Sequence, residues 1–236
     1  MIKILITTVF LFLAIPMFGQ DSLRASDIRR FAHPLKISGY SITGKGAEIL
    51  KNRIKHSQFF LLGEQHESPQ ISELTNALLP ELRSSGFGYF GIEVGPNSTE
   101  KMMEVVKSQN TLYDFNTNFH TKYGDIPIPF FDGRKDELFL KTALKEGFEL
   151  WGLDQEYYTA HLFLIDELYD SSSAKLVIEL FYRSAKTYAE KEFKNDTENK
   201  HYPLFTNLLS SPEIETFFEK CQIPRQRQII TGLRTS

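Results

Sequence analysis

The sequence predicts an α/β protein: a mostly parallel sheet with helices on both faces, followed by a C-terminal helical segment. Three apolar runs support this prediction, at residues 59–62 (FFLL), 88–94 (GYFGIEV) and 148–153 (FELWGL). Short apolar runs of this kind are typical of strands covered on both faces. Helical patterns separate the three runs, and this alternation favours parallel strands joined by right-handed crossovers.

The helices are predicted from apolar residues that recur every three or four positions. Helix 47–55 places Leu50 and Ile54 on one face, and helix 70–83 contains Pro80, which should kink it. Ser211 is the expected N-cap of a helix near the C-terminus. Further helices are expected at 99–107, 132–146, 159–168, 175–190 and 225–233, whereas the charged stretch 191–201 should be exposed.

Length and composition define three regions and exclude several classes of protein. The 236 residues, 41% of them hydrophobic, suffice for one core, and a net charge of −3 without a charged block argues against nucleic acid as a partner. The single cysteine, Cys221, excludes an intrachain disulfide and a multi-thiolate zinc site. We expect a signal peptide at 1–20, an α/β domain at 21–175 and a helical segment at 176–236.

The first 20 residues have the pattern of a secretory signal peptide. Lys3 precedes an apolar run at 4–13, and small residues follow before the polar chain begins, with cleavage expected near Gly19 or Gln20. The residues around this point depart from the usual cleavage pattern, so an uncleaved anchor is the alternative. The pattern predicts an exported bacterial protein, periplasmic or secreted, without stable membrane insertion after cleavage.

Acidic residues end each of the three predicted strands, and a histidine accompanies the first of them. Glu64 and His66 follow the first strand, Glu93 the second and Asp154 the third. Parallel strands place their carboxyl ends at one sheet edge, where ligands bind in open α/β sheets. These four side chains are therefore expected to converge, although Glu64 and His66 could also form a solvated turn, and Asp154 could be a helix N-cap.

Two mechanisms are compatible with this set. In the first, His66 is the general base that activates water for attack on an ester or amide carbonyl, while Glu64 and Glu93 orient the histidine and the water. In the second, Glu64, His66 and Glu93 bind a divalent metal that lowers the pKa of its bound water. The absence of a Gly-x-Ser-x-Gly motif and of a His-x-x-x-His pair disfavours a serine hydrolase and a zincin.

The aromatic-rich stretch 109–131 is broken by Gly124, Pro127 and Pro129. Its composition favours a loop or lid over the site, with a little helix. An irregular insertion packed by its own aromatic side chains is an equally good interpretation. His120 and Tyr123 lie within this stretch, and together with Asp154 they are the candidate substrate-binding residues.

The segments LLGEQHESPQ (61–70) and GYFGIEVGP (88–96) resemble the superfamily of erythromycin esterases and ChaN-like haem-binding lipoproteins, and more remotely the TraB/TIKI-type proteases. The resemblance covers 57–154, and the Glu-x-His spacing is closer to the ChaN-like form. It implies that Glu64, His66 and Glu93 belong to the active centre of a hydrolase that cleaves an ester, lactone or amide in a small-molecule substrate.

Two other functions follow from the same resemblance. A ChaN-like protein would bind haem or iron through Tyr or His side chains, although the signal segment has no lipid-attachment cysteine. Family members also use a histidine from a second half, which no residue after Asp154 clearly supplies. A truncated, non-catalytic member of the family is therefore the third expectation.

Overall fold

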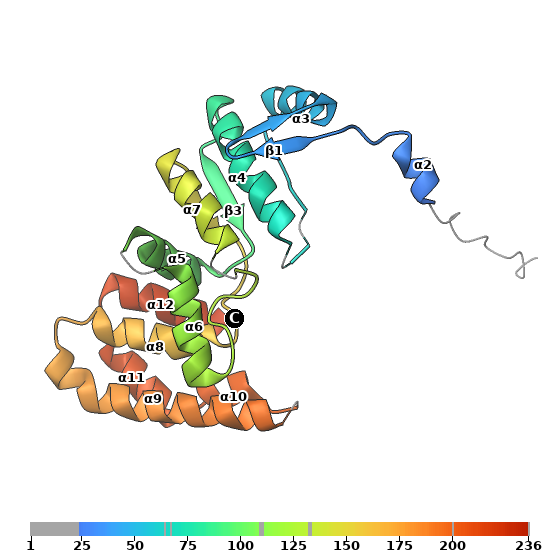
Figure 1. The fold of residues 1–236 in the computed structure, drawn as a ribbon. Coiled ribbons are helices and arrows are strands. Elements are labelled where there is room, and N and C mark those ends of the chain that lie inside the picture. Colours follow the sequence, from blue (N-terminus) through green and yellow to red (C-terminus); the bar gives the residue numbers. More distant parts are fainter. Residues whose placement is uncertain are drawn as a thin grey trace, which may run out of the picture.

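The computed structural model describes residues 24–63, 65–66, 68–108, 111–131, 134–199 and 201–235. The chain is 63% helical, and its described residues form two sheets of two strands each. The predicted mostly parallel α/β sheet is therefore wrong. Figure 1 shows that helices make up most of the molecule and that the strands are short.

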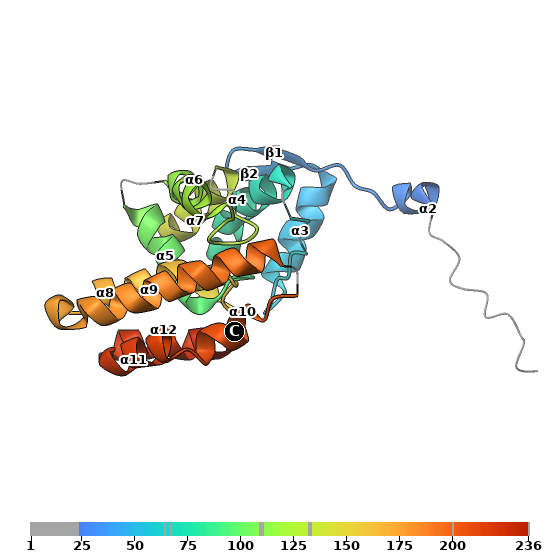
Figure 2. The same cartoon turned by 90° about the horizontal axis from the view of Figure 1, so that it is seen from below.

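The first described elements form a small subassembly beside helix α4 (Pro69–Ser84). Helix α2 (Ala25–Arg29) has no buried residue and lies apart from the rest of the chain (Figures 1 and 2). Strands β1 (Lys36–Ser38) and β2 (Ser41–Thr43) pair antiparallel, and α3 (Lys45–Lys55) follows. Their apolar side chains form a core with α4 that is centred on the buried residues Ile42, Ala47, Ile54, Ala77 and Leu78.

The second and third predicted strands do form a parallel pair. Strand β3 (Tyr89–Ile92) lies beside β4 (Glu149–Gly152), with Tyr89 opposite Glu149 and Ile92 opposite Gly152. Alternate side chains turn inward onto α5 (Pro96–Lys107) and α7 (Lys135–Lys145). Tyr89 and Trp151 stay exposed, with their ring centroids 4.6 Å apart. One face of this sheet is thus open to solvent, as in a half-buried sheet.

The first predicted strand is absent. Residues 59–62 are described without strand structure, and Phe59 and Leu61 are 76% and 91% exposed. Phe60 is partly buried and packs against the core formed with α4. An apolar run becomes a buried strand only where neighbouring strands pair with it, and here the run remains an unpaired extended connection between α3 and α4.

Three helices pack around the parallel pair. Helices α4 (Pro69–Ser84) and α5 (Pro96–Lys107) both begin with proline, whose fixed φ and missing N–H suit the first turn. Helix α7 (Lys135–Lys145) lies against α4 and α5. The core between these helices and the sheet includes Leu79, Met102, Leu140 and the loop residue Ile128.

The stretch expected to be mainly a loop contains a regular helix, α6 (Leu112–Tyr123). The Thr111 side chain accepts a hydrogen bond from the Asp114 amide at its start, and Gly124 ends it with a left-handed φ of 77°. These are standard N-cap and C-cap devices. The capping residues, together with burial of Leu112 and Phe119, outweigh the modest helix propensity of the aromatic residues.

The C-terminal part of the described chain is helical. Helix α9 (Lys175–Glu198) runs through the charged stretch that was expected to be exposed, because Ala185, Ala189 and Phe193 continue one buried stripe at four-residue spacing. Figures 1 and 2 show α9 alongside α8 (Ala160–Asp170) and α11 (Pro212–Lys220). The remaining helices are α8 (Ala160–Asp170), α10 (Leu204–Leu209), α11 (Pro212–Lys220) and α12 (Pro224–Thr235).

Within the described ranges, no helix combines the length and apolarity needed to cross a membrane. The predicted signal peptide, 1–20, lies outside the described residues.

Candidate functional site

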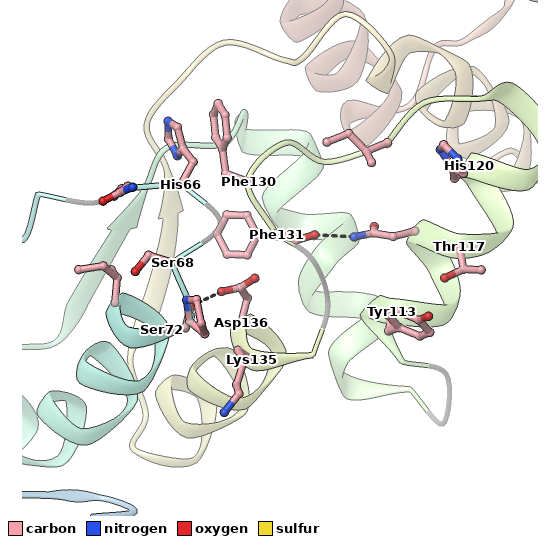
Figure 3. Close-up of a pocket in the computed structure, with 15 residues that line it drawn as sticks. His66, Ser68, Ser72, Tyr113, Thr117, His120, Phe130, Phe131, Lys135 and Asp136 are labelled. Atoms are coloured by element: carbon pink, nitrogen blue, oxygen red, sulfur yellow. Dashed lines mark hydrogen bonds between the residues drawn. The ribbon is translucent and has the colours of Figure 1, made fainter. Parts of the chain in front are cut away.

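A cleft of about 550 Å³ opens where the segment before α4 meets α6, α7 and the loop between them. Figure 3 draws its lining, which comes from four stretches of chain: 65–72, 113–120, 126–131 and 135–136. The lining mixes apolar and polar side chains, and the volume lies in the range of small-molecule sites. We therefore take this cleft as the candidate functional site.

His66 lies on one wall, in the segment that leads into α4. Its imidazole stacks on the ring of Phe130, with 3.6 Å between the ring centroids and 10° between the ring planes. Phe130 has a φ of 66°, in the left-handed region that non-glycine residues rarely adopt. The imidazole of His66 thus packs on the ring of a residue whose own backbone conformation is unfavourable.

The loop that carries Phe130 is fixed on both sides. Pro127, Ile128 and Pro129 are buried, and Thr159 donates a hydrogen bond of 2.6 Å to the Ile126 carbonyl. After Phe130, the Asn116 amide nitrogen lies 2.5 Å from the Phe131 carbonyl oxygen and donates to it (Figure 3). Anchors of this kind can hold a strained residue in place.

Helix α6 forms the opposite wall. Tyr113, Asn116, Thr117 and His120 recur at helical spacing, so that they share the face that lines the cleft. Leu112 and Phe119 occupy the other side and are buried in the protein core. The helical periodicity therefore explains why His120 reaches the cleft from a stretch that was expected to be irregular.

The floor combines a buried carboxylate with a hydroxyl. Ser72 Oγ donates a hydrogen bond of 2.5 Å to Asp136 Oδ1, and both side chains are buried. Beside them, Lys135 forms a 2.5 Å ion pair with Glu73 that is about half exposed. Ser72, Asp136, Asn116 and Phe130 were not identified from the sequence, because their positions depend on how α4, α6 and α7 pack together.

The predicted site residues fall into two groups in the described structure. His66 and His120 line the cleft. Glu93 and Asp154 follow β3 and β4 at the same end of the parallel pair, where the Asp154 amide donates a hydrogen bond of 3.3 Å to the Val94 carbonyl. Both carboxylates are exposed, and neither is part of the cleft lining. Glu64 lies outside the described residues.

Tyr123 lies at the C-terminal end of α6 and does not line the cleft. Its hydroxyl donates a 3.0 Å hydrogen bond to Glu190 Oε1 on α9. Burial, reinforced by the Glu190 carboxylate, raises the pKa of Tyr123 well above its ordinary value. The hydroxyl therefore stays protonated and connects the histidine-bearing helix to the C-terminal helices.

The described residues offer side chains that could ligate haem iron but no cluster for a metal ion. Among the described residues there is no group of three or more His, Cys, Asp or Glu side chains arranged to hold a metal ion. The proposed metal set includes Glu64, which lies outside these residues. His66, His120 and Tyr113 share the cleft and are residue types that ligate haem iron.

The arrangement offers a fixed imidazole, apolar walls and buried polar groups in one concave surface. An imidazole held at a cleft can accept a proton from water, and polar groups such as Asn116 and Ser72 can orient a bound molecule.

Comparisons with protein-family models, with curated proteins and with solved structures found no match to this chain.

Proposed function

We propose that this protein is a hydrolase that cleaves an ester, lactone or amide bond in a small molecule bound in the cleft. The observation that carries this proposal is the placement of His66, whose ring is held against Phe130 at the wall of a cleft of small-molecule size. A general base needs this combination of fixed orientation and access to the substrate.

In the proposed reaction, an imidazole nitrogen of His66 takes a proton from water as the water oxygen attacks the carbonyl carbon. The carbon–oxygen or carbon–nitrogen bond of the leaving group then breaks, and the leaving group receives the proton. His120, across the cleft, is assigned to substrate binding. Glu64, two residues before His66, is the proposed orienting carboxylate, and Glu93, which lies outside the cleft lining, is assigned no role in this reaction.

The resemblance of 57–154 to erythromycin esterases and ChaN-like proteins supports this proposal, as does the predicted signal peptide, which suits an exported enzyme. Macrolide specificity is not part of the proposal.

The test is turnover by the purified protein on a panel of aryl esters, lactones and anilides, compared with His66→Ala. Loss of a general base is expected to lower kcat by about 10²- to 10⁴-fold while the fold is retained. His56→Ala is the matched control, because His56 is an exposed residue that caps α3 and bonds the Asn52 carbonyl outside the cleft. Equal rates for wild type and His66→Ala would exclude His66 as the base.

A haem- or iron-binding protein is the second candidate, because His66, His120 and Tyr113 line the same cleft. These side chains would ligate the iron of the bound haem. Titration with haem should then produce a Soret band that weakens in His66→Ala or His120→Ala. A Soret band without turnover favours this function, whereas the absence of both leaves a non-catalytic member of the proposed family.

A further inference from the structure

We infer that Phe130 is a positioning residue for the reaction: it holds the His66 imidazole in one orientation at the cleft wall. This inference rests on the proposed hydrolase function. Three independent observations carry it, namely the geometry of the ring stack, the backbone conformation of Phe130 and the different environment of the neighbouring Phe131.

The stack fixes the plane of the imidazole while leaving its reactive edge clear of Phe130. The rings of His66 and Phe130 are nearly parallel, at 10°, and their centroids are 3.6 Å apart. Imidazole nitrogens carry their protons and lone pairs in the plane of the ring. A side chain stacked on the face therefore restricts rotation of His66 without occupying the direction in which it would take a proton from water.

The backbone conformation of Phe130 is unfavourable, and core packing of its side chain does not account for it. A φ of 66° is uncommon for a bulky residue, and such conformations persist where the surrounding structure fixes them, often at functional sites. Phe130 is 39% exposed. The strained conformation therefore places a large apolar ring against His66 instead of burying it.

Phe131, the next residue, contacts the core, unlike Phe130. It packs against the core around the parallel strands, with its ring centroid 6.0 Å from that of Phe139. Its carbonyl is held by Asn116. The loop thus uses Phe131 and the buried residues 127–129 as anchors, and Phe130 as the side chain it presents to the histidine.

The test compares Phe130→Leu, which removes the ring but keeps an apolar side chain, with Phe130→Tyr, which keeps the ring. Histidine-labelled protein is examined by NMR, because a ring stacked on Phe130 has an upfield-shifted resonance. The same variants are assayed for kcat and KM on the best substrate of the ester panel. Phe31→Leu, an exposed phenylalanine of the N-terminal region outside the cleft, is the control for loss of a ring elsewhere.

In Phe130→Leu, the His66 resonance should lose its upfield shift, kcat should fall about 10- to 100-fold and KM should stay within about twofold. Phe130→Tyr should retain the shift and most of the rate, and Phe31→Leu should match wild type. An unchanged His66 resonance in Phe130→Leu overturns the inference, as does loss of the shift with kcat unchanged or with the change confined to KM.

Failure of the inference is distinguishable from failure of the proposed function. If His66→Ala abolishes turnover while Phe130→Leu keeps the full rate, the hydrolase function stands and the positioning role is wrong. If wild type shows no turnover, or His66→Ala keeps it, the proposed function fails, and the catalytic role of Phe130 fails with it. The NMR shift then reports only whether the stack exists.

Discussion

Glu156 provides a quantitative test of how the sheet, α5 and the loop after β4 are held together. Its side chain is 3% exposed, yet it is a carboxylate. Oε1 accepts a hydrogen bond of 2.7 Å from the Asn97 amide, and Oε2 accepts from the Ser98 amide at 3.1 Å and the Ser98 hydroxyl at 2.6 Å. These amides belong to the first turn of α5, where helix N–H groups have no intrahelical partner and favour negative charge.

The structure sets the size of the effect expected on substitution. In Glu156→Gln, the side-chain NH₂ group must face one of these donors, so at least one charge-assisted hydrogen bond is lost and a donor is left buried. Hydrogen bonds to charged groups contribute about 1.5–3 kcal/mol each, so we expect the free energy of unfolding to fall by about 2–3 kcal/mol. Glu156→Ala leaves both amides unsatisfied and should lower it by about 3–5 kcal/mol.

Urea unfolding followed by far-UV circular dichroism measures this effect. With a denaturant slope of about 2 kcal/mol per M, the midpoint for Glu156→Gln should fall by about 1 M. Asp154→Asn is the matched control, because it removes the same charge two residues away at an exposed position and should change stability by less than about 0.5 kcal/mol. A midpoint for Glu156→Gln equal to that of Asp154→Asn would refute the capping role.

Four further predictions test other parts of the structure. Burial in α8 lowers the pKa of His161 from 6.5 to about 4, so in this pH range the unfolded chain binds a proton that the folded chain does not. The free energy of unfolding should therefore fall by up to about 3 kcal/mol as the pH drops from 6.5 to 4, and His161→Phe should flatten this slope in urea titrations. Tyr123→Phe removes the bond to Glu190 and should lower the free energy of unfolding by about 1–2 kcal/mol in the same assay; an unchanged value would contradict the anchoring role. Burial raises the pKa of the Cys221 thiol to about 11, so a disulfide reagent at pH 8 should react slowly with the native protein and rapidly in urea, and rapid native reaction would contradict burial. His120→Ala should raise KM more than it lowers kcat in steady-state hydrolysis, whereas a loss confined to kcat would place His120 in the chemical step.

Local patterns predicted several of the helices and the parallel pair but not how they assemble. Glycine, proline and apolar spacing located α3, α4, α5 and α7, and the two apolar runs at 88–94 and 148–153 do pair in parallel. The run at 59–62 is also apolar but has no pairing partner in the described structure, so Phe59 and Leu61 remain exposed. Pairing is a long-range property that a short apolar run does not reveal.

Helices α6 and α9 are indicated in the sequence by capping residues and by apolar spacing. The Thr111 cap and Gly124 stop of α6 are present in the sequence, and the buried stripe Ala185, Ala189 and Phe193 continues through the charged part of α9. The aromatic and charged composition of these two stretches is atypical of helices, although the capping residues and the spacing indicate them. Capping residues and spacing are the better guide where composition is unusual.

The candidate site was predicted in part. The turn after residue 62 drew attention to His66, and His120 was named as a possible ligand contact; both line the cleft, and their roles stay predictions. The sequence could not show that α6 brings these two histidines into one cleft, nor that Glu93 and Asp154 lie outside its lining. Phe130 and the Ser72–Asp136 pair depend on contacts between segments more than 60 residues apart in sequence.

The central claim is that the cleft between His66 and His120 is where this protein binds its small molecule. Histidine-labelled protein titrated with the carboxylic acid product of its best ester substrate tests this directly, since the chain has six histidines to compare. We predict that the resonances of His66 and His120 shift together with one saturation curve, while those of His56 and His201 do not move. Shifts at His56 or His201 with His66 and His120 unchanged would contradict it.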